Sequence, residues 1–182
     1  AVRKQGAGLA NLTSSINTKA YITTYDKNGN AMDKTKLELG DDPSKTGVYE
    51  MHFAVTNFGN TSLTYQLGAY VMTEGVSETK TNAGLPTVTE EGYILSGAVI
   101  SVSGAGVNGT SLTVEAGKTV DVKLTVTLSD SDKQYLNDSF ENGMYVEGFV
   151  TLTATAGTDI DMSIPYLAFY GDWTQAPMFD LE

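Results

Sequence analysis

The chain has 182 residues, enough for one large domain, and 41% of them are hydrophobic, which permits a buried core and argues against wholesale disorder. Its formal net charge of −11 argues against binding to a nucleic-acid backbone, which needs a basic face. No apolar run approaches the roughly 20 residues of a membrane-spanning helix, and the absence of cysteine excludes disulfides, a thiol nucleophile and thiolate metal ligands.

The chain opens with paired glycines in the segment Arg3-Lys4-Gln5-Gly6-Ala7-Gly8-Leu9. Glycine allows the backbone to turn tightly, and this turn precedes a helical segment expected at residues 12–16. The run Thr13-Ser14-Ser15 is a poor helix former, so this helix is expected to be short or absent.

Strands with a period of two are expected next. The first covers residues 18–25 and ends in Asp26-Lys27-Asn28-Gly29-Asn30, which is typical of a turn because Asn and Gly tolerate positive φ. Residues 49–56 and 63–71 alternate apolar and polar side chains as partner strands. The polar stretch 75–96 predicts a long excursion with at most a small hairpin.

The second half of the chain adds further strands and one helix. The clearest strand is 120–128, in which one face consists of Val120, Val122, Leu124, Val126 and Leu128. Ser129 can cap a short helix at residues 132–140. The remaining strands are expected at 99–102, 111–114, 145–155 and 160–169. Seven or eight strands without alternating long helices indicate a two-sheet β-sandwich.

Two motifs in the last third carry a resemblance. Val146-Glu147-Gly148-Phe149 lies in one apolar strand, and Ile164-Pro165-Tyr166 leads through the next strand to Phe169-Tyr170-Gly171-Asp172-Trp173. Together they resemble the fibronectin-type-III-like domain behind the catalytic domain of large cell-envelope subtilases of the lactocepin and complement-peptide-cleaving type. The glycine pair near the start is similar to the closing Gly-x-Gly-Leu-x-Asn segment of a subtilase catalytic domain.

The resemblance implies an all-β, fibronectin-type-III/immunoglobulin-like antiparallel β-sandwich with long loops and one short helix. Residues 1–16 would be the C-terminal remnant of the catalytic domain, and residues 17–182 the sandwich. The function implied is a non-catalytic spacer, packed on the upstream subtilisin-like serine endopeptidase domain of a secreted or bacterial cell-envelope protein. Its long loops, 26–47 and 75–97, would border the substrate cleft and contact the protein or peptide substrate there. The alternative is a surface adhesion or carbohydrate-binding module without a protease.

The residues themselves predict no catalytic, cofactor-binding or metal-binding site. His52 is the only histidine, no carboxylate is patterned beside it, and a structural role is expected. No serine lies in the sequence context of a hydrolase nucleophile. Asp26-x-Asn28-x-Asn30 superficially suggests a calcium loop, but Ala31 and Leu37 replace the glycine and the bidentate acid that an EF-hand requires.

Other acidic and aromatic groups also favour structural roles. The adjacent pairs Glu90-Glu91 and Asp41-Asp42 are expected to point apart in solvated loops, and Asp159 and Asp161 to lie on a solvated strand face. An aromatic sugar-binding platform is conceivable, but burial in the core is favoured for its members, Tyr166, Phe169, Tyr170 and Trp173. Loss of a buried Trp173 side chain would cost about 3–5 kcal/mol.

Overall fold

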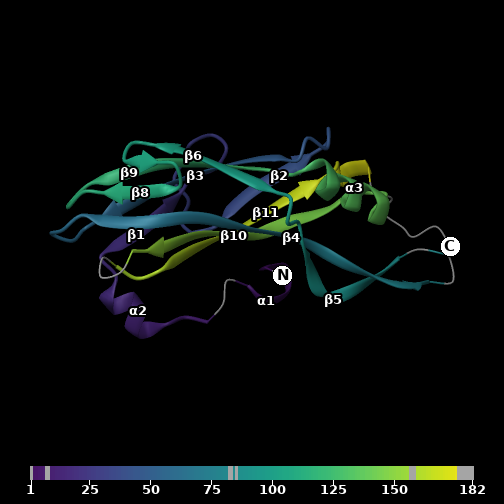
Figure 1. Ribbon diagram of the computed structural model, residues 1–182, viewed down its shortest axis with the longest axis horizontal. Coiled ribbons are helices and arrows are strands. Elements are labelled where there is room, and N and C mark those ends of the chain that lie inside the picture. Colours follow the sequence, from purple (N-terminus) through teal and green to yellow (C-terminus); the bar gives the residue numbers. More distant parts are fainter. Residues whose placement is uncertain (1, 7–8, 82–83, 85, 156–158, 176–182) are drawn as a thin grey trace.

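The computed structural model describes residues 2–6, 9–81, 84, 86–155 and 159–175 as a sandwich of two β-sheets (Figure 1). The smaller sheet contains, in spatial order, β1 (Ala20–Thr24), β3 (Val48–Asn57), β9 (Thr119–Thr127) and β6 (Val99–Gly104). The larger sheet runs in the order β2 (Leu37–Asp42), β11 (Met162–Tyr170), β10 (Met144–Ala154), β4 (Leu63–Lys80), β8 (Ser111–Val114) and β7 (Val107–Asn108), with β5 (Pro86–Ile94) also paired to β4. The predicted all-β sandwich is confirmed.

The core lies between the inner faces of the two sheets. In β9, the fully buried Val122, Leu124 and Val126 alternate with residues that face outward, which confirms the clearest predicted strand. Val146 and Val150 face them from β10 and are also fully buried. Burying one such side chain contributes about 1.5–3 kcal/mol.

The edge strand β2 departs from the prediction in two ways. It lies within the expected loop 26–47, and it pairs with β11 in parallel, with Leu37 opposite Tyr166 and Asp42 opposite Tyr170. The sandwich is therefore not wholly antiparallel. The chain leaves the smaller sheet after β1 and joins the larger sheet as β2, so residues 25–36 cross from one layer to the other.

The expected excursion at 75–96 is largely a β-hairpin. β4 continues to Lys80 and pairs with β5, with register shifts between Glu74 and Val76 and between Ser77 and Lys80. Figure 1 shows this hairpin extending beyond the body of the sandwich. Tyr93 anchors its base by stacking on Tyr135, with ring centroids 3.7 Å apart. The predicted excursion 75–96 is thus mostly paired strand rather than irregular chain.

Helix α3 (Asp130–Ser139) confirms the predicted short helix between β9 and β10. Ser129 is its N-cap and forms a capping box with Asp132, and the acidic residues of the first turn suit the positive end of the helix dipole. Leu136 and Phe140 are buried in the core, which fixes the helix between the two sheets.

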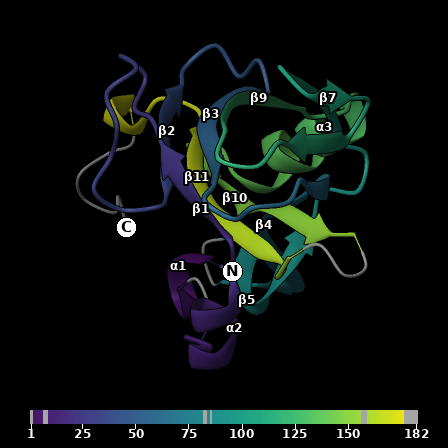
Figure 2. The same cartoon turned by 90° about the vertical axis from the view of Figure 1, so that its left-hand side faces the viewer.

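The N-terminal segment lies outside the sandwich, against the larger sheet (Figure 2). It contains the short helices α1 (Val2–Gln5) and α2 (Leu12–Asn17), so a helix does form at 12–16 despite its polar residues. Asn11 caps α2 by accepting a hydrogen bond from the Ser14 N–H. Gly6 has φ +68, as the predicted tight turn requires, whereas Gly8 lies outside the described residues.

Candidate functional site

Two glutamates are buried on the outer face of the larger sheet. Glu147 of β10 has 0% of its surface exposed and Glu74 of β4 has 5%, although strand alternation directs Glu147 away from the core that takes Val146. A buried carboxylate is costly unless a positive charge and hydrogen-bond donors accompany it. Some other part of the chain must therefore cover and neutralise this face.

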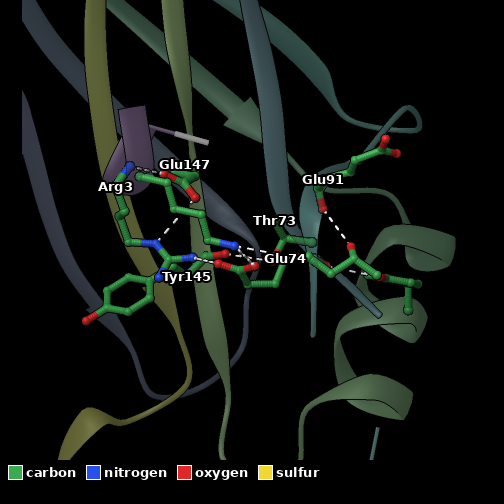
Figure 3. A network of polar contacts seen from close by, with 9 residues as sticks. Arg3, Thr73, Glu74, Glu91, Tyr145 and Glu147 are labelled. Atoms are coloured by element: carbon green, nitrogen blue, oxygen red, sulfur yellow. Dashed lines mark hydrogen bonds and ion pairs between the residues drawn. The ribbon is translucent and has the colours of Figure 1, made fainter. Parts of the chain in front are cut away.

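Helix α1 supplies both the cover and the charge (Figure 3). The Arg3 guanidinium forms an ion pair and hydrogen bond with Glu74, and the Arg3 backbone N–H donates to Glu147 Oε2 at 2.8 Å. Lys4 Nζ donates to Glu74 Oε2 at 2.9 Å and to the Thr89 carbonyl at 3.2 Å. We call this arrangement of Arg3, Lys4, Glu74 and Glu147 the N-terminal clamp.

The two carboxylates of the clamp are not equally satisfied. Glu147 Oε1 lies 3.3 Å from Arg3 Nε, within ion-pair distance, but it accepts no hydrogen bond from the described residues. The Arg3 guanidinium also lies 4.4 Å from the centroid of the Tyr145 ring, close enough for a cation–π contact. Among the described residues, Arg3 is therefore the partner on which Glu147 depends most.

The electrostatics of Glu74 show that the cations outweigh burial. Burial alone would raise the pKa of Glu74, but the hydrogen bonds and charges of Lys4 and Arg3 lower it below the ordinary value. Glu74 is therefore ionised at neutral pH, and its negative charge holds α1 on the sheet.

The structure explains the glycine of the motif Val-Glu-Gly-Phe, which is Gly148 in β10. Gly148 lies opposite Tyr166 on one side and Val71 on the other. The Tyr166 hydroxyl donates to the Tyr70 carbonyl at 2.8 Å, across β10. A Cβ at position 148 would lie 1.8 Å from that carbonyl oxygen and 3.0 Å from the Tyr166 hydroxyl. Only glycine leaves room for this contact between strands.

The aromatic end of the chain corrects one expectation. Tyr166, Phe169 and Tyr170 are buried as predicted, but Trp173 has 56% of its surface exposed. It follows β11 in the short 3-10 helix η1 (Trp173–Gln175), and its ring centroid lies 5.1 Å from that of Phe169 and 5.5 Å from that of Tyr145. The ring of Trp173 makes angles of 83° and 45° with these two rings, so the cluster is not a flat platform.

His52 has more partners than the sequence suggested. Its Nε2 lies 3.6 Å from an Asp121 carboxylate oxygen, and its ring stacks on Tyr25 with centroids 4.5 Å apart. The expectation that no carboxylate lies beside it is wrong, because Asp121 comes from the neighbouring strand β9. These contacts hold the His52 ring on the outside of the smaller sheet.

The acidic residues considered for chemistry bind backbone groups instead. Asp26 Oδ1 accepts from the Asn28 and Asn30 N–H groups at 2.8 Å, which forms the turn that the sequence predicted. Asp42 accepts from the Thr46 and Gly47 N–H groups, and Asp41 accepts from the Trp173 N–H. Asp41 and Asp42 do point to different partners, but they lie on β2 and not in a solvated loop.

Asp159 also differs from its expected solvated position. It accepts hydrogen bonds from the Lys19 N–H at 2.8 Å and the Tyr65 hydroxyl at 2.5 Å, and so joins the start of β1 to β4. Asp161 is exposed as expected, and it accepts from the Ala154 N–H. Glu91 is exposed, whereas the side chain of Glu90 lies outside the described part.

Within the described ranges, no three His, Cys, Asp or Glu side chains are grouped so that they could hold a metal ion. No helix in that part of the chain is long and apolar enough to cross a bilayer. The most specific arrangement is therefore the N-terminal clamp, whose one sequence signal is a lone charge, Glu147, inside the apolar run 145–150.

Two stacked β-sheets with a short helix between consecutive strands define a β-sandwich module of the immunoglobulin and fibronectin type. Residues 37–167 match the family described as the Fn3-like domain. The chain belongs to this family, as its terminal motifs indicated.

Relatives extend the similarity over nearly the whole chain. The chain is 30% identical, over 98% of its length, to a PI-type proteinase of Lactococcus lactis subsp. cremoris. A PII-type proteinase of Lacticaseibacillus paracasei shows the same identity and coverage. The chain spans only 8% of the length of these curated relatives.

Solved structures show weaker likeness. The ASH/PapD-like domain of human CEP192 has a TM-score of 0.47 at 12% identity, covering 90% of this chain and 93% of that one. A family 123 glycoside hydrolase from Clostridium perfringens has a TM-score of 0.46 at 8% identity, covering 84% of this chain and 27% of that one. These values are too low to support an argument about function.

Proposed function

We propose that this chain is the non-catalytic accessory sandwich of a subtilisin-like serine endopeptidase that is secreted or held at a bacterial cell envelope. Two proteinases share 30% identity with 98% of the chain, and in them the matching part is only 8% of the whole. Peptide hydrolysis then belongs to an upstream domain of the same protein, and the sandwich holds that domain in place.

The observation that carries the proposal is the N-terminal clamp. Residues 1–16, in this proposal, are the end of the catalytic domain, and residues 17–182 form the sandwich. Arg3 and Lys4 bind carboxylates that the sandwich buries on its outer face. A buried, multiply bonded ion pair resists rotation, so the clamp supports a spacer that is packed rigidly on its neighbour.

A second feature supports packing against an upstream domain. Leu12 and Ile16 lie one turn apart on α2 and have 74% and 71% of their surfaces exposed, and Leu9 before them is fully exposed. Short helices need tertiary packing of an apolar face for their stability. In this proposal the body of the catalytic domain covers these three side chains.

The hairpin of β4 and β5 is proposed to border the substrate cleft. Its base lies beside the clamp, because Glu74 of β4 and the Thr89 carbonyl of β5 both bind Lys4. The clamp therefore fixes the direction of the arm relative to the preceding segment. Val88 on this arm is 53% exposed and available to a neighbouring polypeptide. In this proposal the arm and residues 26–36 contact protein or peptide substrate.

The first experiment tests whether the catalytic serine lies in an upstream domain and not in residues 1–182. A fluorophosphonate probe should label the full-length protein at one serine but leave purified residues 1–182 unlabelled. The coding sequence upstream should contain a Gly-Thr-Ser-Met-Ala-type nucleophile segment. Stoichiometric labelling of a serine in residues 1–182 would contradict the proposal, as would an upstream region that encodes only repeats or a signal peptide.

The second experiment tests the clamp in the full-length protein. Glu147→Lys should shorten the half-life of peptidase activity at elevated temperature, because it places a cation against Arg3. The matched change Glu115→Lys, in an exposed turn before β9, should leave that half-life unchanged. Equal half-lives for the two variants would contradict the supporting role.

An adhesion or carbohydrate-binding module is the second candidate, and the exposure of Trp173 is the observation that favours it. The Trp173 ring packs at 83° against Phe169 and at 45° against Tyr145, so these three rings do not form one flat face. Glycan-array binding that is lost in a folded Trp173→Ala variant would favour this candidate over the first.

A further inference from the structure

A slot of about 580 Å³ lies where the chain crosses from one sheet to the other. One wall is the edge strand β2, from Leu37 to Asp42, and the other is the first half of β3, from Val48 to His52. The turn at Asp26, the turn between β2 and β3, and Lys123 of β9 contribute its other lining residues. A volume of this size falls within the range of ligand-binding clefts.

The β3 wall of the slot has a backbone edge that lacks a neighbouring strand in the described residues. Even-numbered residues of β3 direct their N–H and C=O groups toward β1, as shown by the Tyr25 N–H donating to the His52 carbonyl. Odd-numbered residues face β9, since the Leu128 N–H donates to the Gly47 carbonyl. The β1 ladder ends at Thr24 and Phe53. Within the described part of the chain, no strand therefore continues beside Val48 and Glu50, and the Val48 N–H donates only to the Thr46 hydroxyl at 3.3 Å, a bond that an added strand would replace.

The opposite wall is also an edge. β2 pairs with β11 on one side and is the outermost strand of its sheet in the described residues. Free strand edges accept an added strand through main-chain hydrogen bonds. Tyr49 also lines the slot, but its hydroxyl is buried, so the slot offers a ligand the backbone groups of the strand edges rather than this side-chain group.

The excess of negative charge that lines the slot favours extended polypeptides that carry positive charge. Two lysines, Lys27 and Lys123, line it together with five carboxylates, those of Asp26, Glu38, Asp41, Asp42 and Glu50. Lys123 forms an ion pair with Glu50 at 3.2 Å, and the lining still carries three more negative than positive charges. Asp26, Asp41 and Asp42 accept from backbone N–H groups, which leaves their negative charge in place. Toward the core, the slot presents Leu37 and Tyr49.

We propose that this slot binds an extended, basic polypeptide segment as an added β-strand along Val48 and Glu50. The segment alternates apolar side chains, which face Leu37 and Tyr49, with lysine or arginine side chains, which face the carboxylates. It continues the line of β1 along β3. This site is separate from the N-terminal clamp, so it stands whether or not the accessory role is correct.

The test uses the whole 182-residue chain and a short synthetic peptide that alternates valine and lysine. Calorimetric titration at physiological ionic strength should show saturable binding, and amide NMR shifts should concentrate at Val48, Glu50 and β2. The same peptide N-methylated at every second residue should not bind, because it cannot complete the main-chain ladder. A valine–glutamate peptide should not bind either.

Two variants that change the net charge by the same amount distinguish binding in the slot from general electrostatic attraction to the acidic chain. Glu50→Lys should weaken binding roughly tenfold, because it places like charges together. Glu115→Lys, near the opposite end of β3, should weaken it less than about twofold. Thermal unfolding of both variants shows whether they are folded. Equal weakening by both variants, undiminished binding of either control peptide, or no binding of the valine–lysine peptide would each overturn the proposal.

Discussion

Replacing Arg3 with alanine tests the N-terminal clamp most directly. The change removes the ion pair with Glu74, the close approach of Nε to Glu147 at 3.3 Å and the contact with the Tyr145 ring. Breaking a buried ion pair from one side costs about 3–5 kcal/mol when the remaining charge stays buried. Here α1 can detach and let water reach both carboxylates, which limits the loss. We therefore expect a loss of about 2 kcal/mol.

Lys4→Ala is the matched control on the same helix. Lys4 also binds Glu74, but its side chain is 42% exposed, whereas that of Arg3 is 26% exposed. Because solvent screens the more exposed pair, Lys4→Ala should cost only about 0.5 kcal/mol. A double-mutant cycle of Arg3→Ala with Glu147→Gln should give a coupling free energy of about 1–2 kcal/mol.

Urea unfolding followed by tryptophan fluorescence measures these differences. Trp173 is the only tryptophan of the chain, and its ring lies 5.5 Å from the Tyr145 ring over which Arg3 sits. The probe therefore reports on the clamp itself. Equal losses for Arg3→Ala and Lys4→Ala, or a coupling free energy below about 0.3 kcal/mol, would refute the reasoning.

Three further changes have distinct expected outcomes. Gly148→Ala should cost about 3 kcal/mol or more by denaturant unfolding, because its Cβ would lie 1.8 Å from a main-chain oxygen of β4; a loss below about 1 kcal/mol would contradict the close approach. Trp173→Ala should cost about 1 kcal/mol rather than the loss of a buried tryptophan, and calorimetry would reveal a larger value. Burial raises the pKa of Tyr49, Tyr65 and Tyr166 in the folded chain, so their contribution to stability is present below pH of about 10 and is lost as the pH rises above it. The midpoint of thermal unfolding should therefore fall in alkali, and fall less steeply in Tyr65→Phe; an unchanged slope would argue against the tyrosine origin.

The strands that the sequence predicted best are those with one buried and one exposed face. β9 is an example, since the alternation from Val120 to Val126 matches its burial along the whole strand. Local periodicity is sufficient there because the sheet has only one apolar side. The cap of α3 at Ser129 was equally visible, because capping depends on residues a few positions apart.

Two of the strand regions that the sequence did not predict, β2 and the outer part of the β4–β5 hairpin, lack that local signal. β2 contains Gly40, Asp41 and Asp42, and its partner β11 is more than a hundred residues later in the chain. In the outer part of β4 and β5, apolar and polar residues do not alternate, because the hairpin leaves the body of the sandwich and has no core to face. Both regions are strands because they pair with another strand, not because of their own residue pattern. For β2 the partner lies far away in the chain, and the residues around β2 cannot indicate it.

The clamp could be predicted only in part. A single glutamate inside the apolar run of β10 indicates that Glu147 has a special environment, but nothing in the sequence identifies Arg3 as its partner. The exposure of Trp173 was missed for a related reason. Gly171, with φ +136, redirects the chain after β11, so the alternation of the strand no longer applies to the residue that follows.

The parallel pairing of β2 with β11 sets how the fold responds to tension. If the chain is pulled just before β2 and just after β11, β2 is drawn toward its N-terminal end and β11 toward its C-terminal end. Because the two strands point the same way, they must slide along each other, and their hydrogen bonds carry the load together. A hairpin would instead open one bond at a time. The parallel pair of β2 and β11 is therefore a part of the sandwich that resists tension in shear.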